Sequence, residues 1–544
     1  MARMKIRVSL RCIVGVGVLA VSGCGLVLGL DDFEDAAPAG SATSGGATSA
    51  GTGGGGTCEP ESKVECYSGA PGTEGVGICQ AGTQACKQDG SGYEACSGEV
   101  TPAAETCAST EDEDCDGKDC VAWATLIGGA EGEAVNDVAV DAMGNVYVVG
   151  TFEGAIPLGE DVLIASGEND AFLVKFSPSG EYLWSRQLGG IYHDTAYAIA
   201  VSPEGEAIVA VVEFDTRLDH SEVVLQRYES SGALSWRRAL GGSMCGIVPS
   251  SVGSMAIVSD GSVVVAGIYC GEIRFDETHA VSNETGLPDA FVAKIRSSDG
   301  GIDGREGWVT VFGGDDVQYV ADVAVDAADN VVVVGSFWGE LRFGDASLQS
   351  AGKADAFVAK LTNLGLVSWV RSSGGVYGDR FDSVAVDRFG GPVVVGVFDG
   401  TFDLGGGEIA VGKVTHVVSR YTTSNIYRWH RTFDMDDVLL GGLSVDARGE
   451  SLVVGGLIGD VELDGETVHP ISADDLLLVK MGERGDLLWT RAFGHVGNRG
   501  AVALAHSDAH GLFVVGRANG MADFGAGTMV PDGESDGFVA KFVP

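Results

Sequence analysis

The six residues DAFVAK occupy positions 289–294 of this 544-residue chain and occur again, letter for letter, at 355–360. Looser copies read DAFLVK at 170–175 and DGFVAK at 536–541. A segment that returns at such wide intervals indicates a structural unit that is repeated along the chain. The pattern around each copy shows which unit it is.

Tryptophans mark the same repeat. Seven of the eight lie at positions 123, 184, 236, 308, 369, 429 and 489, and they open phrases such as WSRQLGG and WTRAFGH. The spacings between them are 61, 52, 72, 61, 60 and 60 residues. A period of this length is typical of a repeat that contains several strands.

Each repeat contains signals for four strands. The segment DVAVDAMGNVYVVG at 137–150 holds two β-branched runs on either side of a turn, which is the pattern of a hairpin. A variable segment follows, then the DAFLVK-type strand and, after a short turn, the strand that carries the tryptophan. Four antiparallel strands in one such repeat predict one blade of a β-propeller.

The two ends of the series predict that the propeller is closed. The chain ends with DGFVAKFVP at 536–544, a third strand with no fourth strand after it. The series begins with VAWATLIGG at 121–129, a fourth strand with no third strand before it. If this strand completes the last blade, no blade keeps an unpaired seam. We therefore expect an all-β protein with a seven-bladed propeller of four-stranded antiparallel blades over 121–544, closed by an N-terminal strand.

The hairpin, the DAFVAK strand and the LWxRxxGG phrase resemble the SBBP-type repeats of bacterial exported propellers and, more distantly, the NHL-type propellers. The resemblance covers residues 121–544 and implies the fold, but it implies no activity because propellers serve many functions. The copies at 221–228 and 416–421 are degenerate. Either they have drifted under a hydrophobic constraint, or these blades face a partner.

Residues 1–23 are predicted to be a lipoprotein signal peptide. An apolar stretch at 12–21 follows four basic residues: Arg3, Lys5, Arg7 and Arg11. The segment Val21-Ser22-Gly23-Cys24 resembles the bacterial lipobox, which implies that Cys24 carries the lipid. Gly25 after it implies the outer membrane, with the protein exposed to the cell surface or the periplasm. The alternatives are a plain signal peptide and an uncleaved anchor helix.

Two segments separate this signal from the propeller. Residues 24–57 are a flexible linker, uncharged and rich in Gly, Ser, Thr and Ala from residue 36 onward. Residues 58–120 hold eight cysteines and few large apolar residues, so we expect a small disulfide-rich stalk with four bridges. Zinc binding is the alternative.

The stalk contains a candidate metal site. Asp112, Asp114 and Asp116 form a D-x-D-x-D-G pattern that resembles the start of a calcium loop, because alternate carboxylates suit Ca²⁺. The bidentate Glu expected at the twelfth position is replaced by Trp123. The alternative is an acidic turn that cysteines hold in place.

The charge of the chain limits its partners. The formal net charge is −43, and removal of residues 1–23, with four basic and no acidic residues, takes it to −47. Such acidity repels nucleic acid and anionic lipid, so we expect neither as a partner and membrane contact through the lipid anchor alone. We expect a monomer.

One face of the propeller is predicted to carry the binding residues. The loops from each fourth strand to the next first strand, and from second to third, share this face, and the second kind is long. Asp137, Asp322 and Asp382 are placed just before innermost strands, where they could bind a cation or sugar hydroxyls at the channel mouth. Alternatively, each caps its own loop. Cys245 and Cys270 should emerge on this face and pair; a reactive thiol is the alternative.

Signatures of catalysis are missing from the sequence, which has neither G-x-S-x-G nor H-E-x-x-H. We expect a binding or scaffold module that is not an enzyme, with a surface protein or polysaccharide as its partner and calcium as the one candidate cofactor. The alternatives are a propeller lyase or hydrolase and a periplasmic envelope-assembly factor.

The lipid anchor is tested by replacing its cysteine. A Cys24→Ala variant should leave the membrane fraction and appear in the soluble fraction, because no acyl chain then holds it to the bilayer. Fractionation of cells that express the variant measures this, with Cys12→Ala as the control that keeps the anchor. Continued membrane attachment of Cys24→Ala would count against the lipobox.

Overall fold

The computed structural model describes residues 58–60, 62–103, 112–115, 121–215, 220–241, 244–245, 248–249, 251–276, 278–283, 286–302, 307–344, 346–472, 475–494, 501–524, 527–533 and 535–543. Every regular element in these ranges is a β-strand. The same ranges contain no helix with the length and apolar character that crossing a bilayer requires. Cys24 and the predicted signal peptide and linker lie outside them.

Seven four-stranded antiparallel sheets form the propeller. Blade 1 consists of β4 (Glu133–Val140), β5 (Val146–Phe152), β8 (Asp170–Phe176) and β9 (Tyr182–Leu188); blade 2 of β10 (His193–Val201), β11 (Ala207–Asp215), β12 (His220–Tyr228) and β13 (Leu234–Gly241); blade 3 of β16 (Ser251–Ile257), β17 (Val263–Tyr269), β20 (Asp289–Ile295) and β21 (Trp308–Phe312); and blade 4 of β22 (Gln318–Val325), β23 (Val331–Phe343), β24 (Ala346–Leu361) and β25 (Val367–Ser373). Blade 5 consists of β26 (Arg380–Val386), β27 (Pro392–Phe398), β30 (Thr415–Tyr421) and β31 (Tyr427–Asp434); blade 6 of β32 (Val438–Val445), β33 (Ser451–Leu457), β36 (Asp475–Met481) and β37 (Leu487–Phe493); and blade 7 of β38 (Ala501–Ser507), β39 (Gly511–Ala518), β42 (Asp536–Phe542) and β3 (Val121–Ile127).

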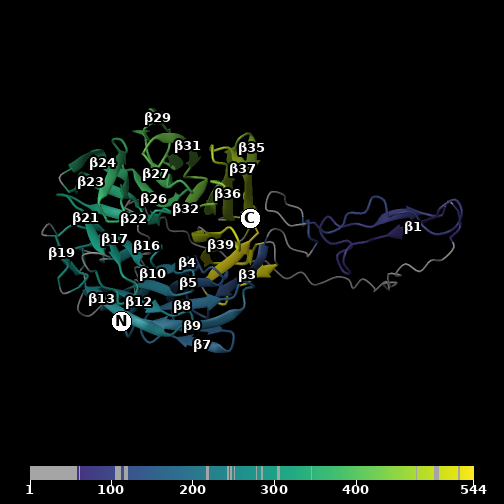
Figure 1. Cartoon of the computed structure of the whole chain (residues 1–544), viewed down its shortest axis with the longest axis horizontal. Coiled ribbons are helices and arrows are strands. Elements are labelled where there is room, and N and C mark those ends of the chain that lie inside the picture. The colour runs from purple at the N-terminus through teal and green to yellow at the C-terminus, as the bar shows by residue number, and fades with distance from the viewer. Residues whose placement is uncertain are drawn as a thin grey trace, which may run out of the picture. The chain divides into compact units, whose positions relative to one another are not determined.

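The blades form a closed ring. Figure 1 shows the innermost strands, among them β4, β10, β16, β22, β26 and β32, around a common centre. Each innermost strand contacts the innermost strands of both neighbouring blades, and β38 of the last blade contacts β4 of the first. In blade 7 the order is β3-β42-β39-β38, with Trp123 opposite Lys541. The predicted closure by the N-terminal strand is therefore confirmed.

The cores of the propeller lie between its blades. The buried apolar residues form seven clusters, and each of them joins two adjacent blades. In the DAFVAK strand of blade 4, Phe357 packs against blade 3 and Val358 packs against blade 5. Successive side chains of a strand point to opposite faces, so one strand serves two junctions. The expectation that these residues pack against neighbouring blades is confirmed.

The lysine at the end of the repeat forms a buried ion pair. Lys360 Nζ lies 2.8 Å from Asp326 Oδ2, in the turn after the first strand of its own blade, and donates to the carbonyl of Gly390 in the next blade at 2.9 Å. The same pairing recurs in five other blades: Lys175–Asp141, Lys294–Asp260, Lys480–Asp446, Arg227–Glu206 and Arg420–Asp387. The degenerate copies in blades 2 and 5 thus keep the cation as arginine.

The tryptophans of six outer strands form hydrogen bonds to the next blade. Trp123 Nε1 donates to the carbonyl of Pro178 at 3.0 Å, in the turn between the third and fourth strands of blade 1. Equivalent bonds join Trp184 to Ser230, Trp236 to Ser297, Trp308 to Asn363, Trp369 to Thr423 and Trp429 to Glu483. Gly180 in the same turn has φ +83°, and a Cβ there would lie 2.7 Å from the Trp123 ring. One tryptophan–turn contact per junction explains the repeat of about 60 residues.

The variable segments between second and third strands are mostly hairpins. They are β6 (Ala155–Leu158) with β7 (Asp161–Ile164), β18 (Glu272–Arg274) with β19 (Ala280–Ser282), β28 (Thr401–Asp403) with β29 (Glu408–Ala410), β34 (Val461–Leu463) with β35 (Glu466–Val468), and β40 (Ala522–Asp523) with β41 (Thr528–Met529). In blade 4 the long β23 and β24 take this role. Apolar residues of these hairpins, such as Ile156 and Phe402, are buried in the junction cores. The long loops that were expected to carry binding residues therefore also pack between adjacent blades.

The stalk is a small disulfide-bonded unit. Strand β1 (Lys63–Cys66) pairs with β2 (Gly82–Ala85), and three bridges join Cys58 to Cys86, Cys66 to Cys96 and Cys79 to Cys115. The expectation of a disulfide-rich segment is confirmed. Cys107 and Cys120 lie outside the described residues, so the fourth bridge stays a prediction.

Closure of the ring is tested by removing its last strand. A chain that ends before Asp536 lacks β42, and its buried Phe538, Val539 and Phe542 leave the cores. We expect a loss of at least about 5 kcal/mol in the free energy of unfolding, or of the single unfolding transition. Urea unfolding measures this against a control chain that ends at Phe542. A change of less than about 1 kcal/mol would contradict the role of the closing pairing.

Candidate functional site

The innermost strands share an irregularity that shapes the centre of the propeller. In all seven blades the register with the second strand shifts at the same place, as it does between Val135 and Asp137 in β4. A bulge of this kind bends the strand and redirects a side chain. The residues at and just after the bulge are therefore those that the fold can present to the central channel.

The three predicted site residues lie at this bulge. Asp137 in β4 and Asp322 in β22 are equivalent residues just after it, and Asp382 in β26 is the bulged residue itself. The interpretation that these residues come before their strands is wrong, because β4 and β22 begin four residues earlier, at Glu133 and Gln318. The antiparallel pairing simply continues across the bulge.

Asp322 connects the innermost strands of three blades. Its Oδ1 accepts a hydrogen bond from Ser254 Oγ of blade 3 at 2.6 Å. Its Oδ2 accepts bonds from Ser383 Oγ at 2.9 Å and from the Val384 N–H at 2.8 Å, both in blade 5. Burial raises the pKa of this carboxyl, and these bonds oppose the rise.

Asp137 of blade 1 occupies the place that Asp322 occupies in blade 4. Its Oδ2 accepts a bond from the Ile199 N–H of blade 2 at 2.8 Å, and its Oδ1 accepts one from the Val138 N–H at 2.8 Å. Burial and, to a smaller extent, the charge of Asp322 in blade 4 raise the pKa of Asp137 to about 7. The fold therefore brings together two of the predicted carboxylates, each of which also holds adjacent blades.

Asp382 has a basic partner of its own. Arg380 Nε donates to its Oδ1 at 2.7 Å, and the carboxylate is 26% exposed. Burial raises the pKa of Asp382, while Arg380 lowers it. Lone pairs that protein donors leave free on the three carboxylates could accept sugar hydroxyls or a cation. Ligand binding at the channel stays a prediction.

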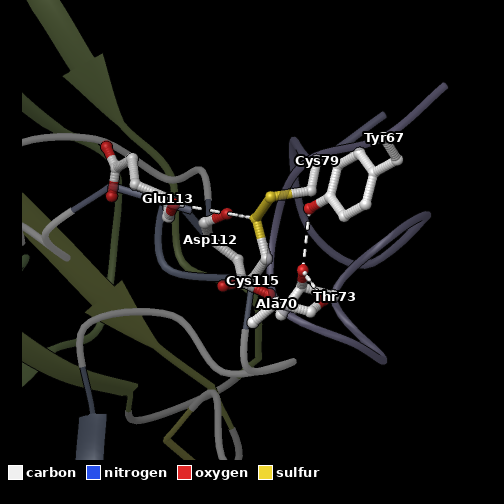
Figure 2. Close-up of a disulfide and its surroundings, with 7 residues drawn as sticks. All are labelled: Tyr67, Ala70, Thr73, Cys79, Asp112, Glu113 and Cys115. Carbon is white, nitrogen blue, oxygen red and sulfur yellow. Dashed lines mark hydrogen bonds between the residues drawn. A yellow bond between two sulfur atoms is a disulfide. The ribbon is translucent and has the colours of Figure 1, made fainter. Parts of the chain in front are cut away.

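The candidate calcium loop of the stalk is described in part. Figure 2 shows Cys115 Sγ near the carbonyl oxygens of Asp112 and Glu113, at 3.7 and 3.6 Å, and bonded to Cys79. Asp114 is described, whereas Asp116 lies outside the described residues. The residues that the structure describes contain no group of three or more His, Cys, Asp or Glu side chains that could hold a metal ion. Calcium binding here stays a prediction.

The predicted cysteine pair is also described in part. Cys270 follows β17, is buried and forms a disulfide. Cys245 belongs to the short strand β14 (Met244–Cys245), which pairs with β15 (Val248–Pro249) between blades 2 and 3. The Cys245 side chain lies outside the described residues, so its pairing with Cys270 stays a prediction, and so does the lipidation of Cys24.

A shallow depression of about 410 Å³ lies at the outer edge of blades 5 and 6. Trp429, Arg431 and Asp464 contribute to its lining. Arg431 forms an ion pair with Asp464 at 2.7 Å and donates to the Gly485 carbonyl, and Trp429 Nε1 donates to Glu483. These polar groups form hydrogen bonds and an ion pair between the two blades.

Sequence reasoning missed a set of buried acidic residues at the blade junctions. They lie where the aspartate of the DAFVAK motif meets the start of the next innermost strand, as Asp355 meets Asp379. The signal that could have found them is the aspartate at a constant place in the repeat, together with the Gly-Gly pair that ends the tryptophan strand. Apolar packing alone explains neither the constant aspartate nor the Gly-Gly pair.

Similarity of this chain to known proteins is confined to solved structures. Neither a protein-family model nor a curated protein matches the sequence. Among solved structures, YCF48 bound to D1 peptide is similar with a TM-score of 0.38 at 9% identity, covering 77% of this chain and 97% of that one. A gluconolactonase from Xanthomonas campestris gives 0.29 at 11%, covering 64% and 89%, and puromycin hydrolase gives 0.36 at 12%, covering 72% and 59%. At such identities the likeness concerns the propeller fold alone.

The channel carboxylates predict an unusual dependence of stability on pH. The folded-state pKa of Asp137 is about 7, above its unfolded value of 3.8, so the folded protein binds the extra proton between these values. The stabilisation is complete below the unfolded pKa and is lost as the pH rises through about 7. In metal-free buffer the free energy of unfolding should therefore fall from about pH 5 to about pH 8.

The Asp137→Asn variant tests this assignment. It should flatten the slope of stability against pH by up to ~1.4 kcal/mol per pH unit, whatever its effect on absolute stability. Urea unfolding at several pH values measures the slope. Glu160→Gln, which removes an exposed carboxylate, is the control and should leave it unchanged. An unchanged slope in Asp137→Asn would refute the raised pKa.

Proposed function

We propose that this protein is a lipid-anchored binding or scaffold module of the cell surface. It recognises a protein or polysaccharide through the face that holds the loops between fourth and first strands and between second and third strands. The lipobox-like segment that ends at Cys24 and the uncharged tether at 36–57 support the anchored arrangement. The likeness to SBBP-type repeats of exported propellers supports the same assignment.

The observation that carries the proposal is a group of exposed apolar side chains on this face. Ile191, Val376 and Tyr377 lie in loops that enter a first strand, and Ile471 and Val530 lie in loops that enter a third strand. Fourth strands end and third strands begin at the same edge of each antiparallel blade, so these residues share one face. Apolar residues scattered over the loops of a rigid ring suit an extended partner.

The acidic surface narrows the kind of partner. With a formal charge of −43, the chain favours neutral or basic partners, such as an uncharged polysaccharide or a basic protein surface. An aromatic side chain such as Tyr377 can stack on a sugar ring while its hydroxyl forms a hydrogen bond.

Paired surface variants test the proposed face. Val376→Ser combined with Tyr377→Ala should weaken binding to an array of bacterial polysaccharides and surface proteins at least about tenfold, a loss of about 1.4 kcal/mol. The control pair is Leu364→Ser with Phe389→Ser, which removes equally exposed apolar residues from turns at the opposite edge of the blades. The control should bind like the unaltered protein.

Two other outcomes would overturn the proposal. If the control pair weakens binding and the loop-face pair does not, the opposite face carries the partner. If binding or turnover of a polysaccharide is lost only in Asp137→Asn and Asp322→Asn, the channel is the site and the lyase or hydrolase alternative is favoured. Protease treatment of intact cells distinguishes the periplasmic alternative, in which the propeller would be protected.

A further inference from the structure

Three blade junctions each bring two buried carboxylates together. One belongs to the aspartate of a DAFVAK-type segment in a third strand, and the other lies at the start of the first strand of the next blade or just before it. The pairs are Asp536 with Glu133, Asp170 with Asp194, and Asp355 with Asp379, and all six residues are at most 3% exposed. The charge of Asp536 raises the pKa of Glu133, that of Asp170 raises the pKa of Asp194, and that of Asp379 raises the pKa of Asp355, each in addition to burial.

The main chain positions both members of a pair. The Asp379 N–H donates to the carbonyl of Ala354, the residue before Asp355, at 2.8 Å. This hydrogen bond connects the two blades. Asp379 Oδ2 accepts the Gly375 N–H at 2.8 Å, and Asp355 Oδ2 accepts the Ala351 N–H at 3.1 Å. The other two junctions have the same main-chain hydrogen bond, from the Glu133 N–H to Ser535 and from the Asp194 N–H to Asn169.

A glycine lies between the two carboxylates. A Cβ at Gly374 would lie 2.6 Å from Asp355 Oδ1 and 3.0 Å from Asp379 Oδ2, so both oxygens face the same small space. Gly374 is the first glycine of the Gly-Gly pair in the repeat, and Gly128 lies against Asp536 in the same way. Any side chain at either position would fill the space beside the carboxylates.

In each pair, at least one carboxylate oxygen accepts no hydrogen bond from the described residues. Asp355 Oδ1, Asp170 Oδ1, Asp536 Oδ1 and Glu133 Oε1 are buried without a hydrogen-bond partner among the described residues. Within the same part of the chain none of the six carboxylates forms an ion pair with a basic side chain. A buried ionised carboxylate without compensation costs several kcal/mol, and a second one beside it adds repulsion. Among the described residues, Arg237 lowers the pKa of Asp194, but it forms no ion pair with either carboxylate of that junction. Each junction can therefore accept a further positive charge.

The remaining described junctions vary in a consistent way. Between blades 3 and 4, Asp289 meets Gln318, whose amide is neutral. Burial raises the pKa of Asp289 to about 6, and hydrogen bonds and Arg342 oppose the rise. Asp289 Oδ1 and Gln318 Oε1 are also buried without a hydrogen-bond partner among the described residues. Between blades 5 and 6, Thr415 meets the buried Val438, with no carboxylate at either place. A carboxylate in one strand is thus matched by a carboxylate or its amide in the next, and an uncharged residue by an uncharged residue.

We propose that the junctions formed by Asp536 with Glu133, Asp170 with Asp194, and Asp355 with Asp379 each bind a calcium ion. Two carboxylates neutralise one divalent cation, and Ca²⁺ accepts carboxylate and main-chain carbonyl oxygens in flexible geometry. Carbonyls of the same turns and water complete its coordination. Mg²⁺ suits these sites less because it demands near-ideal octahedral geometry and keeps its waters. The bound ions stabilise the ring between blades.

The experiment uses the mature chain and Ca²⁺ as the probe. Atomic-emission analysis after equilibrium dialysis gives the calcium bound per chain, and thermal unfolding at about pH 8 compares calcium with EDTA, where protons do not compete. We expect calcium to raise the melting temperature. Glu133→Gln should remove one bound ion, since glutamine occupies the equivalent place at Gln318, and Glu133→Gln with Asp194→Asn and Asp379→Asn should remove three.

Two controls separate other calcium sites from these. Asp289→Asn alters a junction that has a single carboxylate and should leave the bound calcium unchanged. Asp112→Asn with Asp114→Asn removes the acidic loop of the stalk and should leave the three junction ions in place. The three junction ions and the thermal shift that they cause should survive both controls.

Other results would overturn the proposal. If neither calcium nor EDTA changes the melting temperature while acidification raises it, each pair shares a proton and holds no cation. If calcium binds but the junction variants retain it all and the stalk variant loses it, the ion belongs to the stalk. Because Glu133→Gln mimics a residue that the fold already accepts, its loss of calcium is distinguishable from unfolding.

Discussion

The pairing of β3 with β42 holds the propeller together as a ring. It joins residues that lie more than 400 positions apart, and it supplies the fourth strand of a blade whose other three strands end the chain. Once this pairing forms, each blade has a neighbour on both sides. The apolar faces of its strands can then pack against those neighbours. Without it, blade 7 would expose an unpaired strand edge, and Trp123 could not reach the turn of blade 1.

The repeated motifs are explained by contacts between blades. In DAFVAK the phenylalanine and the valine pack against opposite neighbours, and the lysine forms a buried ion pair with an acidic turn of its own blade. The tryptophan donates to the turn of the next blade. A side chain that makes the same contact at every junction must recur once per blade, which is why these residues repeat and the exposed ones between them do not.

Acidic residues play two different parts in the molecule. Most of them give the chain its strong negative charge, which favours solubility and disfavours anionic partners. A minority are buried where blades meet, at the channel and at the junctions, and there they accept main-chain and hydroxyl hydrogen bonds from adjacent strands. Burial raises the pKa of Glu133 and of Asp137, so the stability of the ring is coupled to the pH of the medium.

The sequence by itself determined the fold class, the number of blades and the closure, because period, strand pattern and the offset of the first tryptophan strand are all local features. It also placed Asp137, Asp322 and Asp382 near the centre, since each follows from its position in a repeat. Only the tertiary structure decided that Asp137 and Asp322 accept hydrogen bonds from the next blade, that the long segments pack between blades, and that Asp355 meets Asp379. Those relations join different repeats, and their partners are fixed by how the sheets pack, which no single segment encodes.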